Sequence, residues 1–260
     1  MTAREALAHA GRRLDDAGVE TPRVDAEWLV SHLLGTTRSG LAARLDDEVD
    51  GLEPLLERRE RREPLAYILG EWGFRRLTLK TDARALVPRP ETETLVERAL
   101  ALASEFERPR ILDVGVGSGA IALALKDERP DARVTGVDVS TNALALAREN
   151  AECLGLEVEL RQADGAVVAA EGWDVVVANP PYVETLDDVP QELRWEPDIA
   201  LLGSGEHERL ARAAQARFVV FEVGDGQAPA VAAALSAAGW RDVRVTKDLT
   251  GTERVVEGAK

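Results

Sequence analysis

The sequence of 260 residues is poor in the side chains that bind metals or form covalent intermediates: it has one cysteine and three histidines. A single cysteine, Cys153, excludes an internal disulfide framework, and its helical surroundings predict a small buried residue. The histidines (His9, His32 and His207) lack the spacing of metal ligands, so we expect no metal site. No Ser-His-Asp or Cys-His arrangement is credible, which argues against nucleophilic catalysis.

Long hydrophobic runs are also missing. No stretch approaches the length needed to cross a membrane, and the N-terminus lacks the apolar core of a secretion signal. We therefore expect a cytoplasmic protein that has no membrane partner.

Positive charge is scarce as well. The sequence has 32 basic and 47 acidic residues, which gives a net charge of −15. An acidic surface repels nucleic acid, so we expect no direct nucleic-acid partner and favour a basic protein partner. Four arginines do cluster: Arg58, Arg59, Arg61 and Arg62. Because glutamates alternate with them (Glu57, Glu60 and Glu63), we interpret this cluster as a solvated helix face with paired charges.

The order of the apolar segments predicts three parts. Residues 1–69 show helical spacing, with Thr2 as a helix cap, and form a small helical domain. Residues 70–85 alternate like a connecting β-hairpin. Residues 86–260 alternate strands with helices, including helices over 92–104 and 206–216, which predicts an α/β fold: a Rossmann-like, largely parallel sheet with helices on both faces. The last two strands, near 243–246 and 254–257, are joined by so few residues that we expect an antiparallel hairpin.

A glycine-rich loop follows the first strand of this sheet. The strand Arg110–Val114 runs into the five loop residues, and a helix follows from Ala120. These loop residues are Gly115, Val116, Gly117, Ser118 and Gly119. The G-x-G-x-G spacing argues against a dinucleotide and for a smaller ligand that packs close to the backbone. A plain tight turn is the alternative.

Two acidic residues end the neighbouring strands. Asp138 ends the second strand, where a carboxylate can accept hydrogen bonds from both hydroxyls of a ribose. Its alternative role is to stabilise the following helix, which begins near Ser140. Asp113 ends the first strand beside the glycine loop and can face a cationic group.

The segment Asn179-Pro180-Pro181-Tyr182 follows the apolar run Trp173–Ala178. The prolines fix a rigid turn with the Asn179 carboxamide at its tip. The Asn179 oxygen and the Pro180 carbonyl can accept both hydrogens of a planar amino group while Tyr182 stacks on its face. Such a grip would push a delocalised nitrogen lone pair toward an electrophile, which predicts methyl transfer. A proline-stiffened surface turn is the alternative.

Together these residues and several further motifs resemble the HemK/PrmC family of S-adenosylmethionine-dependent methyltransferases, which modify a glutamine of peptide-chain release factors. The resemblance covers nearly the whole chain. The further motifs are Pro64-Leu65-Ala66-Tyr67-Ile68-Leu69-Gly70, Phe74, Leu86-Val87-Pro88-Arg89-Pro90-Glu91-Thr92-Glu93, Phe221-Glu222-Val223-Gly224 and Lys247-Asp248-Leu249-Thr250-Gly251-Thr252-Glu253-Arg254.

The resemblance implies S-adenosylmethionine as the cofactor and release factors as the protein substrate, with residues 1–69 as a docking module. It also implies roles for residues near the loop. Asp164 would meet the adenine amino group, unless it is a turn residue beside Gly165, where the family often carries a larger side chain. Arg89, Glu91 and Glu93 resemble a segment that covers the cofactor, although the glutamates would also stabilise a helix N-terminus. Between Leu202 and Phe218 the chain is shorter than in the family.

Three functions are compatible with these observations. We favour N5-methylation of a release-factor glutamine. Methylation of a nucleobase amino group uses the same grip, but it predicts a basic groove and a target-recognition segment. A non-enzymatic adaptor predicts broken cofactor glycines or a lost asparagine, and the sequence has neither.

Overall fold

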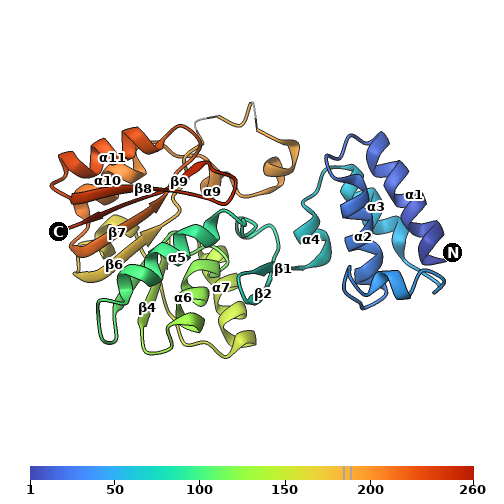
Figure 1. Ribbon diagram of the computed structural model, residues 1–260, viewed down its shortest axis with the longest axis horizontal. Helices are drawn as coiled ribbons and strands as arrows, with labels where there is room; N and C mark the ends of the chain where they lie inside the picture. The colour runs from blue at the N-terminus through green and yellow to red at the C-terminus, as the bar shows by residue number, and fades with distance from the viewer. Residues whose placement is uncertain (184, 188) are drawn as a thin grey trace. The chain divides into compact units, whose positions relative to one another are not determined.

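Figure 1 shows the computed structural model, which describes residues 1–183, 185–187 and 189–260. The chain divides into two compact units. One comprises Met1–Glu71 and Pro190–Trp195, and the other comprises Trp72–Val189 and Glu196–Lys260. None of the described helices is long and apolar enough to cross a membrane.

The first unit is built of helices around its own apolar core. Its elements are α1 (Ala3–Asp16), α2 (Pro22–Leu33), η1 (Leu41–Ala43), α3 (Leu52–Glu60), α4 (Leu65–Leu69) and η2 (Gln191–Trp195). Thr2 caps α1 as predicted, because its hydroxyl accepts a hydrogen bond from the Glu5 backbone and the Glu5 side chain accepts one from Thr2. Leu14, Leu29 and Leu56 are fully buried between the helices.

The arginine cluster is only partly the solvated face that we expected. Two members pair locally with glutamates, Arg58 with Glu63 and Arg61 with Glu57. Arg59, however, is buried and donates to Asp25 on α2 at 2.7 Å and to Glu192 at 3.0 Å. Arg62 also binds Glu192, at 2.7 Å. The prediction was wrong for Arg59 because its two partners are distant in sequence, so helical spacing could not reveal them.

The second unit begins with a two-stranded sheet of β1 (Glu71–Phe74) and β2 (Leu77–Lys80). Its main sheet has seven strands in the order β5-β4-β3-β6-β7-β9-β8. The strands are β3 (Arg110–Val114), β4 (Arg133–Asp138), β5 (Glu159–Gln162), β6 (Trp173–Ala178), β7 (Ala216–Glu222), β8 (Arg241–Lys247) and β9 (Glu253–Ala259). The first five are parallel, and β9 is antiparallel to both β7 and β8. The predicted Rossmann-like fold and its antiparallel end are therefore confirmed.

Helices cover both faces of this sheet (Figure 1). They are α5 (Thr92–Ala103), α6 (Ala120–Glu128), α7 (Thr141–Leu154), α8 (Gly165–Ala169), α10 (Glu206–Ala213) and α11 (Ala228–Ala237). The short helix α9 (Asp198–Leu201) lies in the connection between β6 and α10. Alternate strand residues serve opposite faces, as the pleat requires. Ile111 of β3 packs with α5, α6 and α7, whereas its neighbour Leu112 packs with α8, α10 and α11.

Two local predictions were wrong. The helix that we expected over 206–216 ends at Ala213, because Ala216 already pairs with Trp173 as the first residue of β7. Cys153, expected to be buried, is exposed on α7. The short helices α4, α8 and α9 were not predicted, since four or five residues are too few to show a helical period.

Candidate functional site

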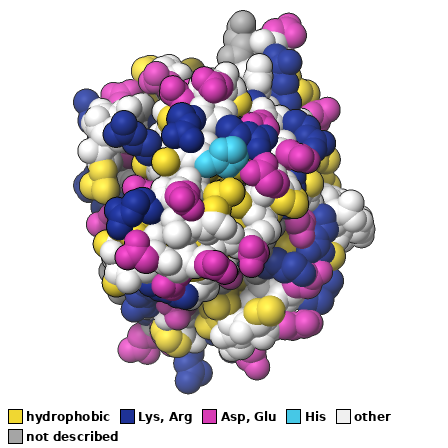
Figure 2. Space-filling view, turned by 90° about the vertical axis from the view of Figure 1, so that its right-hand side faces the viewer, with side chains coloured by type: hydrophobic (Ala, Val, Ile, Leu, Met, Phe, Trp, Pro, Cys, Tyr) yellow, Lys and Arg dark blue, Asp and Glu magenta, His cyan; other side chains and the backbone are white. Residues whose placement is uncertain are grey.

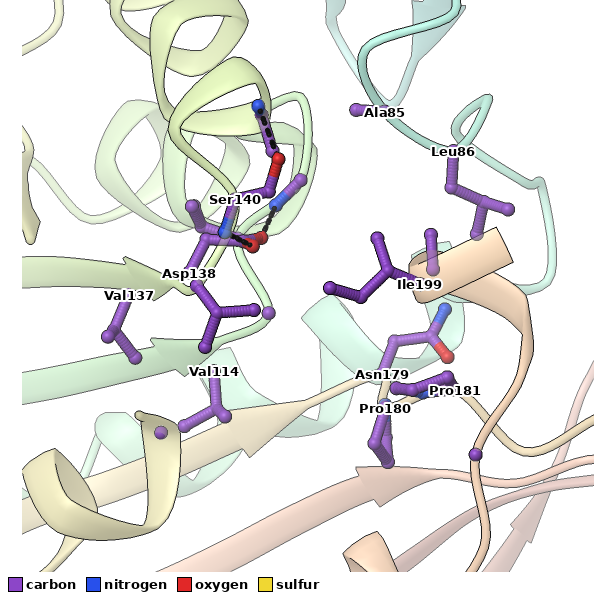
Figure 3. Close-up of a pocket in the computed structure, with 18 of the residues that line it drawn as sticks. Ala85, Leu86, Val114, Val137, Asp138, Ser140, Asn179, Pro180, Pro181 and Ile199 are labelled. Atoms are coloured by element: carbon purple, nitrogen blue, oxygen red, sulfur yellow. Dashed lines mark hydrogen bonds between the residues drawn. The ribbon is translucent and has the colours of Figure 1, made fainter. Parts of the chain in front are cut away.

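A cavity of about 350 Å³ opens at the carboxyl ends of β3, β4 and β6. The chain leaves β3 toward β4 on one side and returns to β6 on the other, so this is the switch point where α/β sheets bind ligands. Figure 3 shows Val114, Val137 and Asn179 around this space, each at or just after the end of a strand. The volume lies in the usual range of small-molecule sites.

The glycine loop forms one wall of the cavity. Gly115, Val116, Gly117 and Ser118 all line it. Gly115 and Gly117 have φ angles of 77° and 54°, a region that side-chain-bearing residues rarely adopt. Gly119, with φ of 89°, caps α6 instead, and a Cβ there would lie 2.9 Å from Leu123 Cδ1. The loop therefore presents backbone to the cavity, and its last glycine allows close helix packing.

Asp138 also lines the cavity, where it is half-buried beside the glycine loop. Its Oδ2 accepts a hydrogen bond from the Gly117 backbone at 3.0 Å, and its Oδ1 accepts one from the Ser140 backbone at 2.9 Å. The second of these bonds is drawn in Figure 3. Because each carboxylate oxygen has a second lone pair, Asp138 remains able to accept from two ligand hydroxyls.

Asp113 is placed differently from our expectation that it faces a cationic group. It is fully buried and is not among the residues that line the cavity. Its Oδ2 accepts from the Ala122 backbone at 3.0 Å, which ties β3 to α6, and Oδ1 has no hydrogen-bond partner among the described residues. Burial, helped by the charge of Asp138, raises the pKa of Asp113 to about 7 although the Ala122 bond opposes this.

Asp164 and Gly165, which follow β5, both line the cavity. Asp164 caps α8 and forms an ion pair with Arg209, whose charge holds the pKa of Asp164 below its ordinary value. A Cβ at Gly165 would overlap Val114 Cγ1. The glycine is therefore required by close packing against β3, which explains why a larger side chain is missing here.

Asn179, Pro180 and Pro181 line the cavity, but Tyr182 does not. The Tyr182 ring packs over Gly224, where a Cβ would lie 3.0 Å from Tyr182 Cδ2, and its carbonyl accepts from Gln227 at 3.1 Å. Burial raises the pKa of Tyr182 to about 12. The ring therefore supports the turn from behind rather than facing the cavity.

Of the three residues in the predicted covering segment, only Arg89 lines the cavity. Arg89 forms an ion pair with Glu196, a fully buried carboxylate that also accepts from the Val87 backbone at 3.0 Å. Glu91 is the residue before α5, and Glu93 accepts from the Arg75 backbone at 2.9 Å. The two glutamates thus occupy the helix start that we gave as their alternative role.

The region where the chain is short forms another wall. Ile199 and Leu202 line the cavity and remain substantially exposed. Gly203 lies against the proline turn so closely that a Cβ would be 2.5 Å from the Pro181 carbonyl oxygen. An apolar, partly open surface therefore lies beside Asn179.

Sequence reasoning placed two polar residues near Asn179, Thr92 and Glu222, in motifs but gave neither of them a role. Thr92, the first residue of α5, lines the cavity, and its Oγ1 lies 3.5 Å from Asn179 Nδ2. Glu222, the last residue of β7, is buried, and the side chains of Thr92 and Asn179 are near enough to lower the pKa of its carboxyl group. The available signal was the apolar run before Glu222, which places this carboxylate at a strand end.

Comparison with known proteins agrees with this architecture. Residues 5–70 match the PrmC N-terminal domain, and residues 92–205 match the methyltransferase small domain. Among solved structures, the hMettl16 catalytic domain superimposes with a TM-score of 0.57 at 14% identity over 70% of this chain and 74% of that one. At this identity the likeness concerns the fold alone.

Two curated relatives are much closer in sequence. The release factor glutamine methyltransferase of Deinococcus radiodurans is 40% identical over 100% of this chain and 99% of its own length. The protein of the same name from Rhodospirillum rubrum is 40% identical over 93% of this chain and 80% of its own length. The chain therefore belongs to the family of release factor glutamine methyltransferases.

Proposed function

We propose that this protein transfers a methyl group from S-adenosylmethionine to the N5 side-chain amide of a glutamine in a peptide-chain release factor. The observation that carries the proposal is that Asn179 and its two prolines line the same cavity as the glycine loop. One cavity thus offers a nucleotide-type site and a grip for a planar amide.

The residues of the cavity fit the cofactor. Asp138 offers carboxylate oxygens to ribose hydroxyls, and the backbone of Gly115 and Gly117 allows close approach to the amino-acid part. When bound, S-adenosylmethionine supplies an electrophilic methyl group. No metal has a part in this proposal, and the described residues contain no cluster of three or more His, Cys, Asp or Glu that could hold one.

The chain's own contribution to the chemistry is positioning and exclusion of water. The Asn179 Oδ1 and the Pro180 carbonyl accept the two N–H bonds of the glutamine amide, which orients its nitrogen lone pair toward the cofactor. Ile199 and Leu202 shield the amide from solvent. The methylated nitrogen is acidic until it loses its extra proton, so the proton can leave to water without a strong base.

The partner and the compartment follow from the same proposal. A release factor is a substrate of the translation machinery, so the enzyme acts in translation termination in the cytoplasm. The net charge of −15 favours a protein substrate over direct contact with nucleic acid, and it gives no reason to expect membrane binding.

The test of this function is incubation with labelled S-adenosylmethionine and purified release factors, DNA and RNA, followed by mass spectrometry. We expect one added methyl on a glutamine side chain of a release factor. Methyl groups found only on a nucleobase would overturn the proposal in favour of the nucleic-acid alternative.

Residues 1–69 are proposed to dock the release factor, and 70–85 to connect this domain to the methyltransferase domain, 86–260. Removal of residues 1–70 should lower the rate on an intact release factor while cofactor binding, measured by calorimetry, is kept. Equal rates for the truncated and the full-length enzyme would contradict docking by this domain.

A further inference from the structure

A buried carboxylate lies directly beside the proposed amide grip. In the parallel pairing of β6 and β7, Ala178 is opposite Phe221, so the next residues along each strand, Asn179 and Glu222, are neighbours. Glu222 is 1% exposed, and its Oε2 has no hydrogen-bond partner among the described residues. Burying a carboxylate oxygen without a hydrogen-bond partner costs free energy, so its position here needs an explanation.

Thr92 connects this carboxylate to the asparagine. It is 5% exposed, and its Oγ1 lies 3.5 Å from Asn179 Nδ2. Both side chains are near enough to Glu222 to lower the pKa of its carboxyl group. Side chains from the start of α5, from the residue after β6 and from the end of β7 thus form one small polar group.

The chemistry of this group sets the direction of its hydrogen bonds. An ionised carboxylate can only accept, so the Thr92 hydroxyl donates to Glu222 and has lone pairs left to accept from a neighbour. The neighbour is Asn179, which can donate only through Nδ2. With Nδ2 turned toward Thr92 and Glu222, Oδ1 is the atom left for the cavity.

We propose that Glu222 and Thr92 are positioning residues that hold the Asn179 amide in the one orientation in which its oxygen can accept a hydrogen bond from the substrate amide. The inference rests on the proposed function of Asn179. Neither residue needs to touch the reacting atoms. Without the carboxylate, the asparagine can rotate by half a turn and present a donor to a donor, which repels the substrate.

Protonation of Glu222 would also leave the Asn179 amide free to rotate. Burial raises the pKa of Glu222 to about 7, with the charge of Glu91 adding to the effect and Thr92, Arg254 and Asn179 opposing it. Tyr182 is near enough for the charge of Glu222 to raise its pKa, and Nε2 of His207 on α10 lies 2.7 Å from the Glu222 backbone carbonyl oxygen. A protonated carboxyl group can donate a hydrogen bond to Thr92. The hydrogen bonds among Glu222, Thr92 and Asn179 therefore lose their fixed direction as the pH falls through this range.

Two nearly isosteric variants test the inference through kinetics on the glutamine substrate. Glu222→Gln adds a donor to the group, and Thr92→Val removes the hydroxyl. Each should lower kcat by about 10- to 100-fold, the typical loss when an outer hydrogen-bonding partner is removed, with little change in cofactor affinity. The kcat of the double variant should be little lower than that of either single variant, because both substitutions interrupt the same set of hydrogen bonds.

Controls separate this effect from a general loss of packing. Thr92→Ser keeps the hydroxyl and should stay within about threefold of the wild type. Glu257→Gln makes the same change at a buried carboxylate on β9 that pairs with Arg98, away from Asn179, and should not lower kcat. A kcat of Glu222→Gln within twofold of the wild type, or an equal loss in Glu257→Gln, would overturn the inference.

A second readout does not depend on activity. In ¹⁵N-labelled enzyme, the Asn179 side-chain amide signals should shift with an apparent pKa near 7, and this titration should vanish in Glu222→Gln. Asn179 side-chain signals that neither titrate in the wild type nor change position in Glu222→Gln would overturn the positioning role. Failure of the wild type to methylate any release factor, with the titration present, would instead overturn the proposed function.

Discussion

The two sides of the cavity are built in different ways. Most of the cofactor side comes from one continuous stretch, in which β3, the glycine loop, α6 and β4 follow one another from residue 110 to residue 138, and Asp164 and Gly165 are added after β5. The acceptor side joins Thr92, Asn179 and Glu222, which are far apart in sequence. A nucleotide site can be made by local backbone geometry, whereas a grip for one amide needs side chains that only the finished sheet brings together. Four experiments test this difference, taken here from the largest expected effect to the smallest.

Asn179→Ala should distinguish the acceptor side from the cofactor side most clearly, because it should change turnover but not cofactor affinity. Loss of the amide oxygen should lower turnover by about 10³-fold, at the upper end of the cost of removing one key hydrogen-bonding group. Cofactor affinity, measured by calorimetry, should change little because Asn179 serves the acceptor. Asn142→Ala, exposed on α7, is the matched control. Full activity of Asn179→Ala would disprove the grip.

Asp138→Ala should show the reverse pattern. Hydrogen bonds to a charged group contribute about 1.5–3 kcal/mol, so the dissociation constant of the cofactor should rise by about 10- to 100-fold. Calorimetry measures this change, and Asp131→Ala, an exposed acidic residue just before β4, is the control. Unchanged affinity in Asp138→Ala would contradict the ribose contact.

Gly165→Ala tests how tightly the cofactor side is packed. The added methyl group overlaps Val114 Cγ1, so we expect the free energy of unfolding to fall by about 1–3 kcal/mol. Val114→Ala makes room, and the double variant should recover part of the loss. Urea unfolding of the four proteins measures the coupling, and strictly additive effects would show that the two side chains do not compete for space.

Asp113 predicts a dependence of stability on pH. Because burial raises its pKa from 3.8 to about 7, the folded protein keeps a proton that the unfolded chain loses above about pH 4. The contribution of Asp113 to the free energy of unfolding therefore decreases as the pH rises from about 4 to about 7. Asp113→Asn should flatten this part of the profile by about 1 kcal/mol or more. Parallel profiles for both proteins would exclude a raised pKa.

The same contrast explains what could be predicted from the sequence. The parallel sheet, the glycine loop and the position of Asp138 follow from short patterns that are contiguous in the chain. Glu222 and Arg59 could not be assigned, because their partners lie in other elements and depend on strand register or helix packing. Tyr182 was expected in the cavity from its place next to Pro181, but the direction of a side chain after two prolines depends on the space above Gly224.

The strand order also has a consequence for synthesis. β7 carries Glu222 at its end, and its neighbour on the outer side is β9, which is made after β8. Until both later strands have left the ribosome, β7 has an open edge that can pair with a wrong strand. The glycine loop is complete more than a hundred residues earlier. The glycine loop and Asp138 are therefore synthesised well before the strands that complete the sheet around Glu222.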